Sequence, residues 1–272
     1  MSFVKETIRV MGVDVYCEHD FNGKPPIVLI HGYLASTYTY HKVLPLLQEH
    51  FSVLAIDLPG FGKSEKSKSF RYSFENYAKL VTACMDVFNI SSAMLVGHSM
   101  GGQVVMNVAK FSPERVLKLV LLNSSGYLKR ANRLLIFSSY LPFFHRFVHY
   151  HINKHDVKDV LKDVLYDHSL IDEDMIEQYK RPIMDGNFPH SLIRLLRHRE
   201  GDLSNEELNH LQVPALLLWG KQDKVVPLYI GEKLEKELPQ ANLKVYDKVG
   251  HLITDERPRE VVEDIVMFSF NK

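Results

Sequence analysis

The pattern of apolar and polar positions changes after the first part of this chain. Residues 7–10 and 13–17 alternate on either side of Gly12, which predicts an antiparallel strand pair. Further along, helix-like segments separate most of the unbroken apolar runs, which are Ile27–Ile30, Val53–Ile56, Met94–Val96, Leu119–Leu122, Leu216–Trp219 and Leu243–Tyr246. Strands that are apolar on both faces belong in a parallel sheet covered by helices. We therefore predict an α/β fold with a mostly parallel sheet of about eight strands, flanked by helices.

The strand pattern disappears between residues 126 and 211. This stretch is helical in pattern, aromatic and rich in His and Arg, with breaks at Pro142, Pro182 and Pro189. We predict a core of residues 1–125 and 212–272 and an inserted helical cap of residues 126–211. The insertion leaves the core directly after one strand and returns just before the next, so we expect it to cover the carboxyl ends of the strands. Ligands bind at that edge in open α/β sheets.

The charges of the 272-residue chain cancel, with 33 basic and 33 acidic residues. Because no block of Lys or Arg stands out, nucleic acid is not expected as the main partner. No apolar run approaches the roughly 18 residues that span a bilayer, and residues 1–22 lack the core of a signal peptide. We expect a soluble, cytoplasmic protein without integral membrane association, and its oligomeric state is left open.

Cys17 and Cys84 form no metal or redox motif and are expected to be buried free thiols.

The pentapeptide Gly97–Gly101 follows one apolar run and opens a segment of helical periodicity that ends at Ser112-Pro113. This context predicts a nucleophile elbow, a tight turn between strand and helix that projects Ser99 into a cleft. Glycines at the flanking positions allow the close approach of neighbouring backbone. A serine hydroxyl is a weak nucleophile, so it requires a base and a pair of amide donors nearby.

Four motifs together resemble those of the α/β-hydrolase superfamily, in the branch with a helical cap and an HG-type oxyanion loop. They are His31-Gly32-Tyr33-Leu34, Asp57–Ser64, Gly97–Gly102, and Gly220–Asp223 with Val249-Gly250-His251. The match runs from about residue 3 to 270 and is weakest through the cap.

The resemblance implies a catalytic triad of Ser99, Asp223 and His251, in the chain order that is typical of this fold. His251 follows a strand on a Gly-His loop and matches the family's base, and Asp223 matches the acid. Some relatives carry the acid one strand earlier, but that position falls near Asn123, which has no negative charge. A capping role for either side chain is the alternative interpretation.

The backbone N–H groups of Met100 and Tyr33 are implied as the oxyanion hole, with Leu34 as the alternative second donor. His31 is expected to brace this loop. We expect the substrate to be bound by the set His31, Leu34, Phe61, Phe137 and Phe143. The apolar face of the cap at residues 134–147 favours pocket lining over interfacial lipid contact and predicts an apolar acyl or alkyl group.

We predict a carboxylesterase-like serine hydrolase that cleaves esters of small to medium apolar substrates, a small-molecule substrate class, through an acyl-enzyme. No cofactor or metal is expected; His145, His149, His151 and His155 lie close together in sequence but lack a further ligand motif. The alternatives are hydrolysis of a C–C bond in a diketone-type acid, cofactor-free perhydrolysis, and a non-enzymatic ligand receptor on the same fold. Ser99 in place of a carboxylate argues against a dehalogenase or epoxide hydrolase, and Tyr33-Leu34-Ala35 departs from the glycine-rich loop of the C–C hydrolases.

Overall fold

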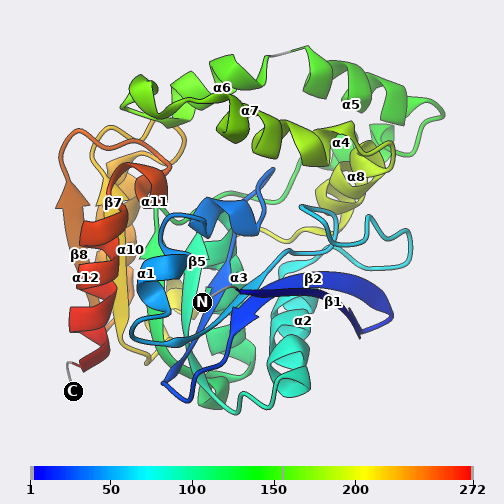
Figure 1. The fold of residues 1–272 in the computed structure, drawn as a ribbon. Coiled ribbons are helices and arrows are strands. Elements are labelled where there is room, and N and C mark those ends of the chain that lie inside the picture. Colours follow the sequence, from blue (N-terminus) through cyan, green and yellow to red (C-terminus); the bar gives the residue numbers. More distant parts are fainter. Residues whose placement is uncertain (1–2, 155, 271–272) are drawn as a thin grey trace.

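The computed structural model describes residues 3–154 and 156–270, except for the side chain of residue 153. Its centre is an eight-stranded sheet with the order β1-β2-β4-β3-β5-β6-β7-β8 (Figure 1). The strands are β1 (Val4–Val10), β2 (Val13–Asp20), β3 (Pro26–Ile30), β4 (Ser52–Ile56), β5 (Ala93–His98), β6 (Val116–Leu122), β7 (Ala215–Gly220) and β8 (Ala241–Tyr246). Strand β2 is antiparallel to both of its neighbours, and the pairings from β4 to β8 are parallel. The predicted fold class is confirmed.

Strands β1 and β2 form the expected amino-terminal hairpin. Met11 and Gly12 at its turn have φ values of 51° and 78°, the left-handed region that tight hairpin turns require. Both strands are longer than the predicted ranges of 7–10 and 13–17: β1 begins at Val4, and β2 continues to Asp20. Most of β1 is exposed, so its outer residues carry little of the apolar signal on which the sequence prediction depends.

Helices cover both faces of the sheet, and the strands bury residues on both sides. In β3, Val28 and Ile30 belong to one apolar cluster with α2 (Phe74–Val87), α3 (Met100–Phe111) and α10 (Leu228–Glu237). Ile27 and Leu29 belong to the opposite cluster, with α1 (Leu44–Leu47) and α12 (Pro258–Phe270). Alternate side chains along one strand therefore enter two cores, which is why the parallel strands have unbroken apolar sequences. The remaining elements outside the segment between β6 and β7 are short helical turns: η1 (Thr37–Tyr40), η2 (Pro113–Arg115) and α11 (Ile253–Glu256).

The segment between β6 and β7 consists of helices and loops, with no strand in the part that the structure describes. Its elements are α4 (Arg133–Ser138), α5 (Phe144–Asn153), α6 (Val157–Val164), η3 (His168–Leu170), α7 (Glu173–Lys180), η4 (Arg181–Met184), α8 (Phe188–His198) and α9 (Asn205–Asn209). Figure 1 shows α4 to α8 as a layer across one end of the sheet. His251, which follows β8, donates its backbone N–H to Val164 O of this layer at 2.6 Å. The layer therefore lies over the carboxyl ends of the strands.

Cys17 and Cys84 are fully buried free thiols, as predicted. Among residues 3–154 and 156–270, no helix has the length and apolar character that would let it cross a bilayer.

Candidate active site

Ser99 lies between β5 and α3 in a strained backbone conformation. Its φ of 53° and ψ of −121° lie outside the regions that residues with a side chain normally occupy. The turn is tight because its neighbours lack side chains: a Cβ on Gly97 would lie 2.4 Å from Gly101 O, and one on Gly101 would lie 2.1 Å from Ile30 O. The glycines let α3 start directly against β3 and β5, and this packing holds Ser99 in its unusual conformation.

Asp223 and His251, from the loops after β7 and β8, form a hydrogen bond of 2.7 Å between Oδ2 and Nδ1. The other carboxylate oxygen of Asp223 accepts the backbone N–H groups of Val225 at 2.7 Å and Val226 at 2.9 Å. Burial alone raises the pKa of Asp223, but hydrogen bonds from His251 and other donors outweigh it and hold the pKa below its ordinary value of 3.8. The pair is therefore a buried carboxylate and an imidazole oriented by it.

Asn123, directly after β6, donates its Nδ2 to Asp223 Oδ2 at 2.5 Å. It thus occupies the strand end where some relatives carry the acid, and here it contacts Asp223, the predicted acid, which follows the next strand. Sequence reasoning excluded Asn123 as the acid but did not predict this contact.

His98 holds the backbone of the His251 loop. Its Nε2 donates to His251 O at 2.9 Å, and the two rings lie 4.7 Å apart. Burial, with the nearby His251, lowers the pKa of His98 to about 3, so its ring is neutral. Because Val164, in the helical layer between β6 and β7, accepts the N–H of His251, the loop is held from two directions. Sequence reasoning assigned no role to His98, since nothing in the motif indicates its partner.

The loop after β3 passes against the elbow. A Cβ on Gly32 would lie 2.8 Å from Ser99 Cβ, so this backbone approaches the serine closely. His31 is fully buried and braces the loop: its Nδ1 donates to Gly32 O at 2.7 Å, and its Nε2 accepts the N–H of Leu58 at 3.0 Å. Burial lowers the pKa of His31 to about 4, which keeps the ring in the neutral form that this pairing requires.

A cavity of about 380 Å³ opens over Ser99. Tyr33 and Met100, whose N–H groups are the expected oxyanion donors, line it together with Ser99. No acceptor is found for either N–H within residues 3–154 and 156–270. The remaining walls come from the core and from the segment between β6 and β7: Ser125, Leu128, Lys129, Ala131, Leu192, Leu195, Leu196, Arg199, Val225 and Val226. In the described chain, no hydrogen bond joins Ser99 Oγ to His251, a link that is often looser in unliganded enzymes.

The structure does not bring all of the expected substrate-binding residues to this cavity. Phe137 and Phe143 are 69% and 62% exposed and do not line it, so their assignment to the pocket is wrong in this structure. Phe61 is buried one layer behind, with its ring 5.9 Å from that of Tyr33. Leu34 packs against the core, and His31 acts through hydrogen bonds of the loop. The apolar walls at Leu192, Leu195 and Leu196 were missed, because helical periodicity alone does not distinguish a cavity wall from a core face.

Two cations also border the cavity, and sequence reasoning did not single them out. Lys129 and Arg199 both line it. The Arg199 guanidinium is partly engaged, 3.5 Å from Leu128 O and 3.7 Å from Asp202 Oδ1. The cavity is thus apolar for most of its wall, with positive charge at one side.

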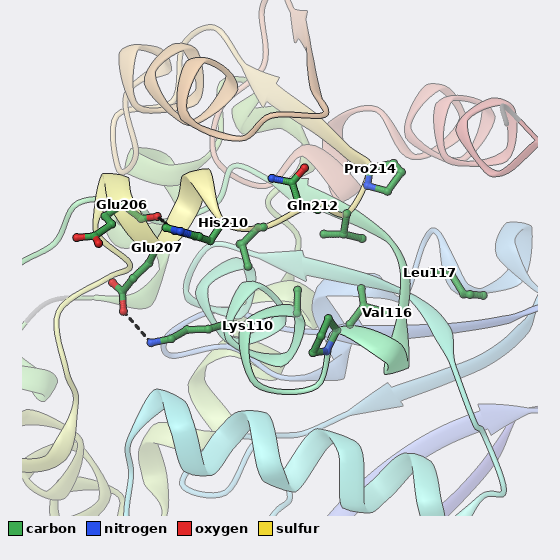
Figure 2. Close-up of a pocket in the computed structure, with 12 residues that line it drawn as sticks. Lys110, Val116, Leu117, Glu206, Glu207, His210, Gln212 and Pro214 are labelled. Carbon is green, nitrogen blue, oxygen red and sulfur yellow. Dashed lines mark hydrogen bonds and ion pairs between the residues drawn. The ribbon is translucent and has the colours of Figure 1, made fainter.

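A second cavity, of about 560 Å³, lies at the far end of α3, between α9 and the start of β6 (Figure 2). It is larger than the Ser99 cavity, but it contains none of the predicted site residues. Two of its charged side chains form an ion pair, with Lys110 Nζ 2.7 Å from Glu207 Oε1. In the described chain, no group of three or more His, Cys, Asp or Glu side chains is arranged to hold a metal ion. His145 stacks on His190 and His151 contacts Phe147, whereas His155 lies outside the described residues.

Comparisons with known proteins agree with this fold. A family model described as "alpha/beta hydrolase fold" matches residues 25–258. The uncharacterized hydrolase YugF of Bacillus subtilis is 44% identical over 260 residues, which cover 95% of each chain. The 2-hydroxy-6-oxo-2,4-heptadienoate hydrolase of Pseudomonas putida is 27% identical, over 89% of this chain and 87% of its own.

A solved structure with the same fold is the 2-hydroxy-6-oxo-6-phenylhexa-2,4-dienoate hydrolase of Rhodococcus sp. strain RHA1. Its TM-score is 0.83 at 22% identity, and the match covers 99% of both chains. A membrane phospholipase A matches with a TM-score of 0.81 at 24% identity, over 98% of this chain and 86% of its own. At these identities the likeness concerns the fold alone.

Proposed function

The chain belongs to the α/β-hydrolase family, and we propose that it is a serine hydrolase that cleaves carboxylic esters of small to medium apolar substrates. One observation carries this proposal: the buried hydrogen bond between Asp223 and His251, on two loops at the strand ends where the strained Ser99 elbow also lies. A nucleophile, a base and an acid that orients the base are the groups that acyl transfer requires.

In the proposed acylation, Ser99 Oγ attacks the ester carbonyl carbon while His251 Nε2 takes the hydroxyl proton. The carbonyl oxygen becomes an oxyanion, which the N–H groups of Tyr33 and Met100 stabilise. As the tetrahedral intermediate collapses, His251 gives its proton to the leaving alkoxide, and the alcohol departs. Asp223 stays ionised throughout and fixes the tautomer of His251, with hydrogen bonds from Val225 and Val226 that hold its carboxylate in place.

Deacylation repeats these steps with water as the nucleophile. His251 takes a proton from water, the hydroxyl attacks the acyl carbon, and Ser99 leaves with the proton that His251 returns. The products are the carboxylic acid and free enzyme. We infer that residues 126–211 act as a cap during this cycle, because their Leu128, Leu192 and Leu195 supply walls of the Ser99 cavity.

The cavity supports an apolar acyl or alkyl group of modest size. Most of its lining is aliphatic, and its volume of about 380 Å³ lies at the small end of the range for small-molecule sites. An apolar group that enters this space leaves water for a preformed wall, which favours binding.

C–C bond hydrolysis of a diketone-type acid is the second candidate function. Lys129 and Arg199 at the cavity wall could pair with a substrate carboxylate, which a simple ester lacks. One relative named above, at 27% identity, is a dienoate hydrolase. Against this candidate, Arg199 already contacts Asp202 and backbone carbonyls, and the loop after Gly32 carries Tyr33 and Leu34 in place of glycines.

The two candidates are separated by turnover of p-nitrophenyl esters from acetate to dodecanoate against a chromogenic 2-hydroxy-6-oxo-dienoate. We expect faster ester cleavage, with an optimum at short to medium chain length, and a loss of several orders of magnitude in kcat for Ser99→Ala. Ser112→Ala, at the other end of α3, is the matched control and should keep wild-type rates. Faster turnover of the dienoate, lost in Ser99→Ala, would favour the C–C hydrolase; no turnover of either substrate by folded wild type would contradict both.

A further inference from the structure

Helices α4 and α5 present an exposed apolar surface that the fold does not cover. Within residues 132–151, Ser139 is the one fully buried residue. The large side chains that face solvent here include Leu134 (73% exposed), Phe137 (69%), Tyr140 (64%), Leu141 (55%), Phe143 (62%), Phe147 (56%) and Tyr150 (65%). We call residues 132–151 the cap patch. Exposed apolar side chains gathered on two consecutive helices indicate an interaction site in a folded protein.

The charge of the cap patch and its flanks is one-sided. Residues 127–154 include Lys129, Arg130, Arg133, Arg146 and Lys154 but no Asp or Glu, in a chain whose net charge is zero. All five cations are exposed. In the described chain, none of them forms an ion pair with a carboxylate. Arg146 lies over the ring of Phe143, 4.8 Å from its centroid, so positive charge and aromatic surface are interleaved.

This combination fits a lipid surface with anionic headgroups. Helices that lie in the plane of a membrane carry Phe, Leu or Trp on one side and Lys or Arg around it, and Tyr is enriched at headgroup depth. Basic residues are attracted to anionic lipid, and the absence of carboxylates removes the opposing repulsion. A protein partner would need a matching acidic and apolar surface, whereas a bilayer with anionic lipid supplies negative charge and an apolar interior together.

We propose that the cap patch is a peripheral membrane-binding surface that docks on bilayers containing anionic lipid. Its position relates it to the candidate active site: Leu128, Lys129 and Ala131 line the Ser99 cavity, and α4 begins at Arg133. Docking of α4 and α5 therefore places this wall of the cavity next to the headgroup layer. A substrate with an apolar chain then reaches the cavity from the membrane rather than from water.

The test is co-sedimentation of the full chain with vesicles of phosphatidylcholine, alone or mixed equally with phosphatidylglycerol. We expect binding to the mixed vesicles that weakens as salt is added and little binding to phosphatidylcholine alone. The double variant Leu134→Ser/Phe147→Ser should lose at least about tenfold in partition coefficient, and Arg133→Gln/Arg146→Gln should lose the preference for the anionic lipid. Leu117→Ser is the matched control, because Leu117 is 53% exposed and lines the second cavity, at the far end of α3 (Figure 2).

Absence of binding by wild type, or equal binding by wild type and the double variants, would overturn the proposal. A wild-type dimer in solution that the variants dissociate would assign the cap patch to contact between copies and would also overturn it. The substituted side chains are exposed, so thermal unfolding should not change. Turnover of a water-soluble ester without vesicles should be equal in all variants, which separates a failure of membrane binding from a failure of the proposed catalytic function.

Discussion

At the scale of single residues, the environment of Asp223 determines what the candidate site can do. Desolvation opposes its charge, and the donors around it restore that charge: His251, Asn123 and the N–H groups of Val225 and Val226. Because the pKa of Asp223 is held below 3.8, the carboxylate stays ionised as pH falls toward 4. A loss of activity in weakly acidic buffer is therefore not expected to arise from this group.

Asp223→Asn should leave the loop intact and lower kcat by roughly 10³- to 10⁴-fold, since the amide favours the wrong tautomer of His251. Ester turnover at saturating substrate measures this effect. Asp247→Asn is the control, because Asp247 is exposed and pairs with Lys221, and it should match wild type. A decrease of less than about tenfold for Asp223→Asn would indicate that another carboxylate orients the base.

Single residues also show what the sequence can predict about this site. The positions of Ser99, Asp223 and His251 follow from short motifs at strand ends, whose spacing is visible in the chain. The support from His98 and Asn123 is not visible, because it depends on which loops meet across β5, β6 and β8. Phe137 and Phe143 were misplaced for a related reason: an aromatic residue has the same identity whether it lines a cavity or faces solvent.

At the scale of elements, the junction of β3, β5 and α3 leaves no room for side chains at the glycines of the elbow. Gly101→Ala would place a Cβ 2.1 Å from the carbonyl oxygen of Ile30, and a backbone atom in a central strand cannot move aside. We expect a loss of about 3 kcal/mol or more in the free energy of unfolding, measured by urea denaturation. Gly186→Ala is the control, because no atom lies within 4 Å of its added Cβ. Equal stability of the two variants would contradict this account of the elbow.

The apolar runs predicted the buried strands well, because burial on both faces leaves a continuous signal in β3, β4 and β7. The helices between β6 and β7 were predicted as a class but not in their bounds. Pro182 and Pro189 were interpreted as breaks, yet both lie in the first turns of helices, η4 and α8. Proline is favoured there because the first helical N–H groups have no intrahelical partner, so the same residue can end one helix and begin another.

At the scale of the whole molecule, the sheet order β1-β2-β4-β3-β5-β6-β7-β8 determines which loops share an edge. Chain periodicity predicted the strands but contains no information on their neighbours, and the family resemblance supplied the expected arrangement. The division into a core and a cap of residues 126–211 remains a proposal. The described helices of that segment contribute both the cavity walls and the exposed cap patch.

At this scale, two histidines that are buried in neutral form contribute to how the stability of the molecule depends on pH. His98 and His31 have pKa values of about 3 and 4 in the folded protein, against 6.5 for an ordinary histidine. Below pH 6.5 these two histidines take up protons in the unfolded chain but not in the folded protein, so their contribution to the free energy of unfolding decreases as pH falls from 6.5 toward 4.

His98→Gln removes the contribution of His98. Between pH 7 and pH 4 the free energy of unfolding of this variant should therefore rise by roughly 1–3 kcal/mol relative to that of wild type, although the variant is less stable at pH 7. His210→Gln, at an exposed residue, is the control. The comparison between variants is decisive, because the buried carboxylates of Asp57, Asp202 and Asp255 have raised pKa values that act in the opposite direction. An equal pH dependence of the free energy of unfolding in wild type and His98→Gln would contradict a neutral buried His98.

The central claim, that Ser99 is an activated nucleophile, is tested most directly by mass spectrometry after reaction with a fluorophosphonate. The nucleophilic serine displaces fluoride and keeps the phosphonyl group, because water attacks a tetrahedral phosphonyl ester far more slowly than an acyl ester. We predict one adduct per chain, located on the peptide that contains Ser99, present in Ser112→Ala and absent in Ser99→Ala. An adduct on another residue, or an unlabelled protein that still hydrolyses esters, would contradict the account.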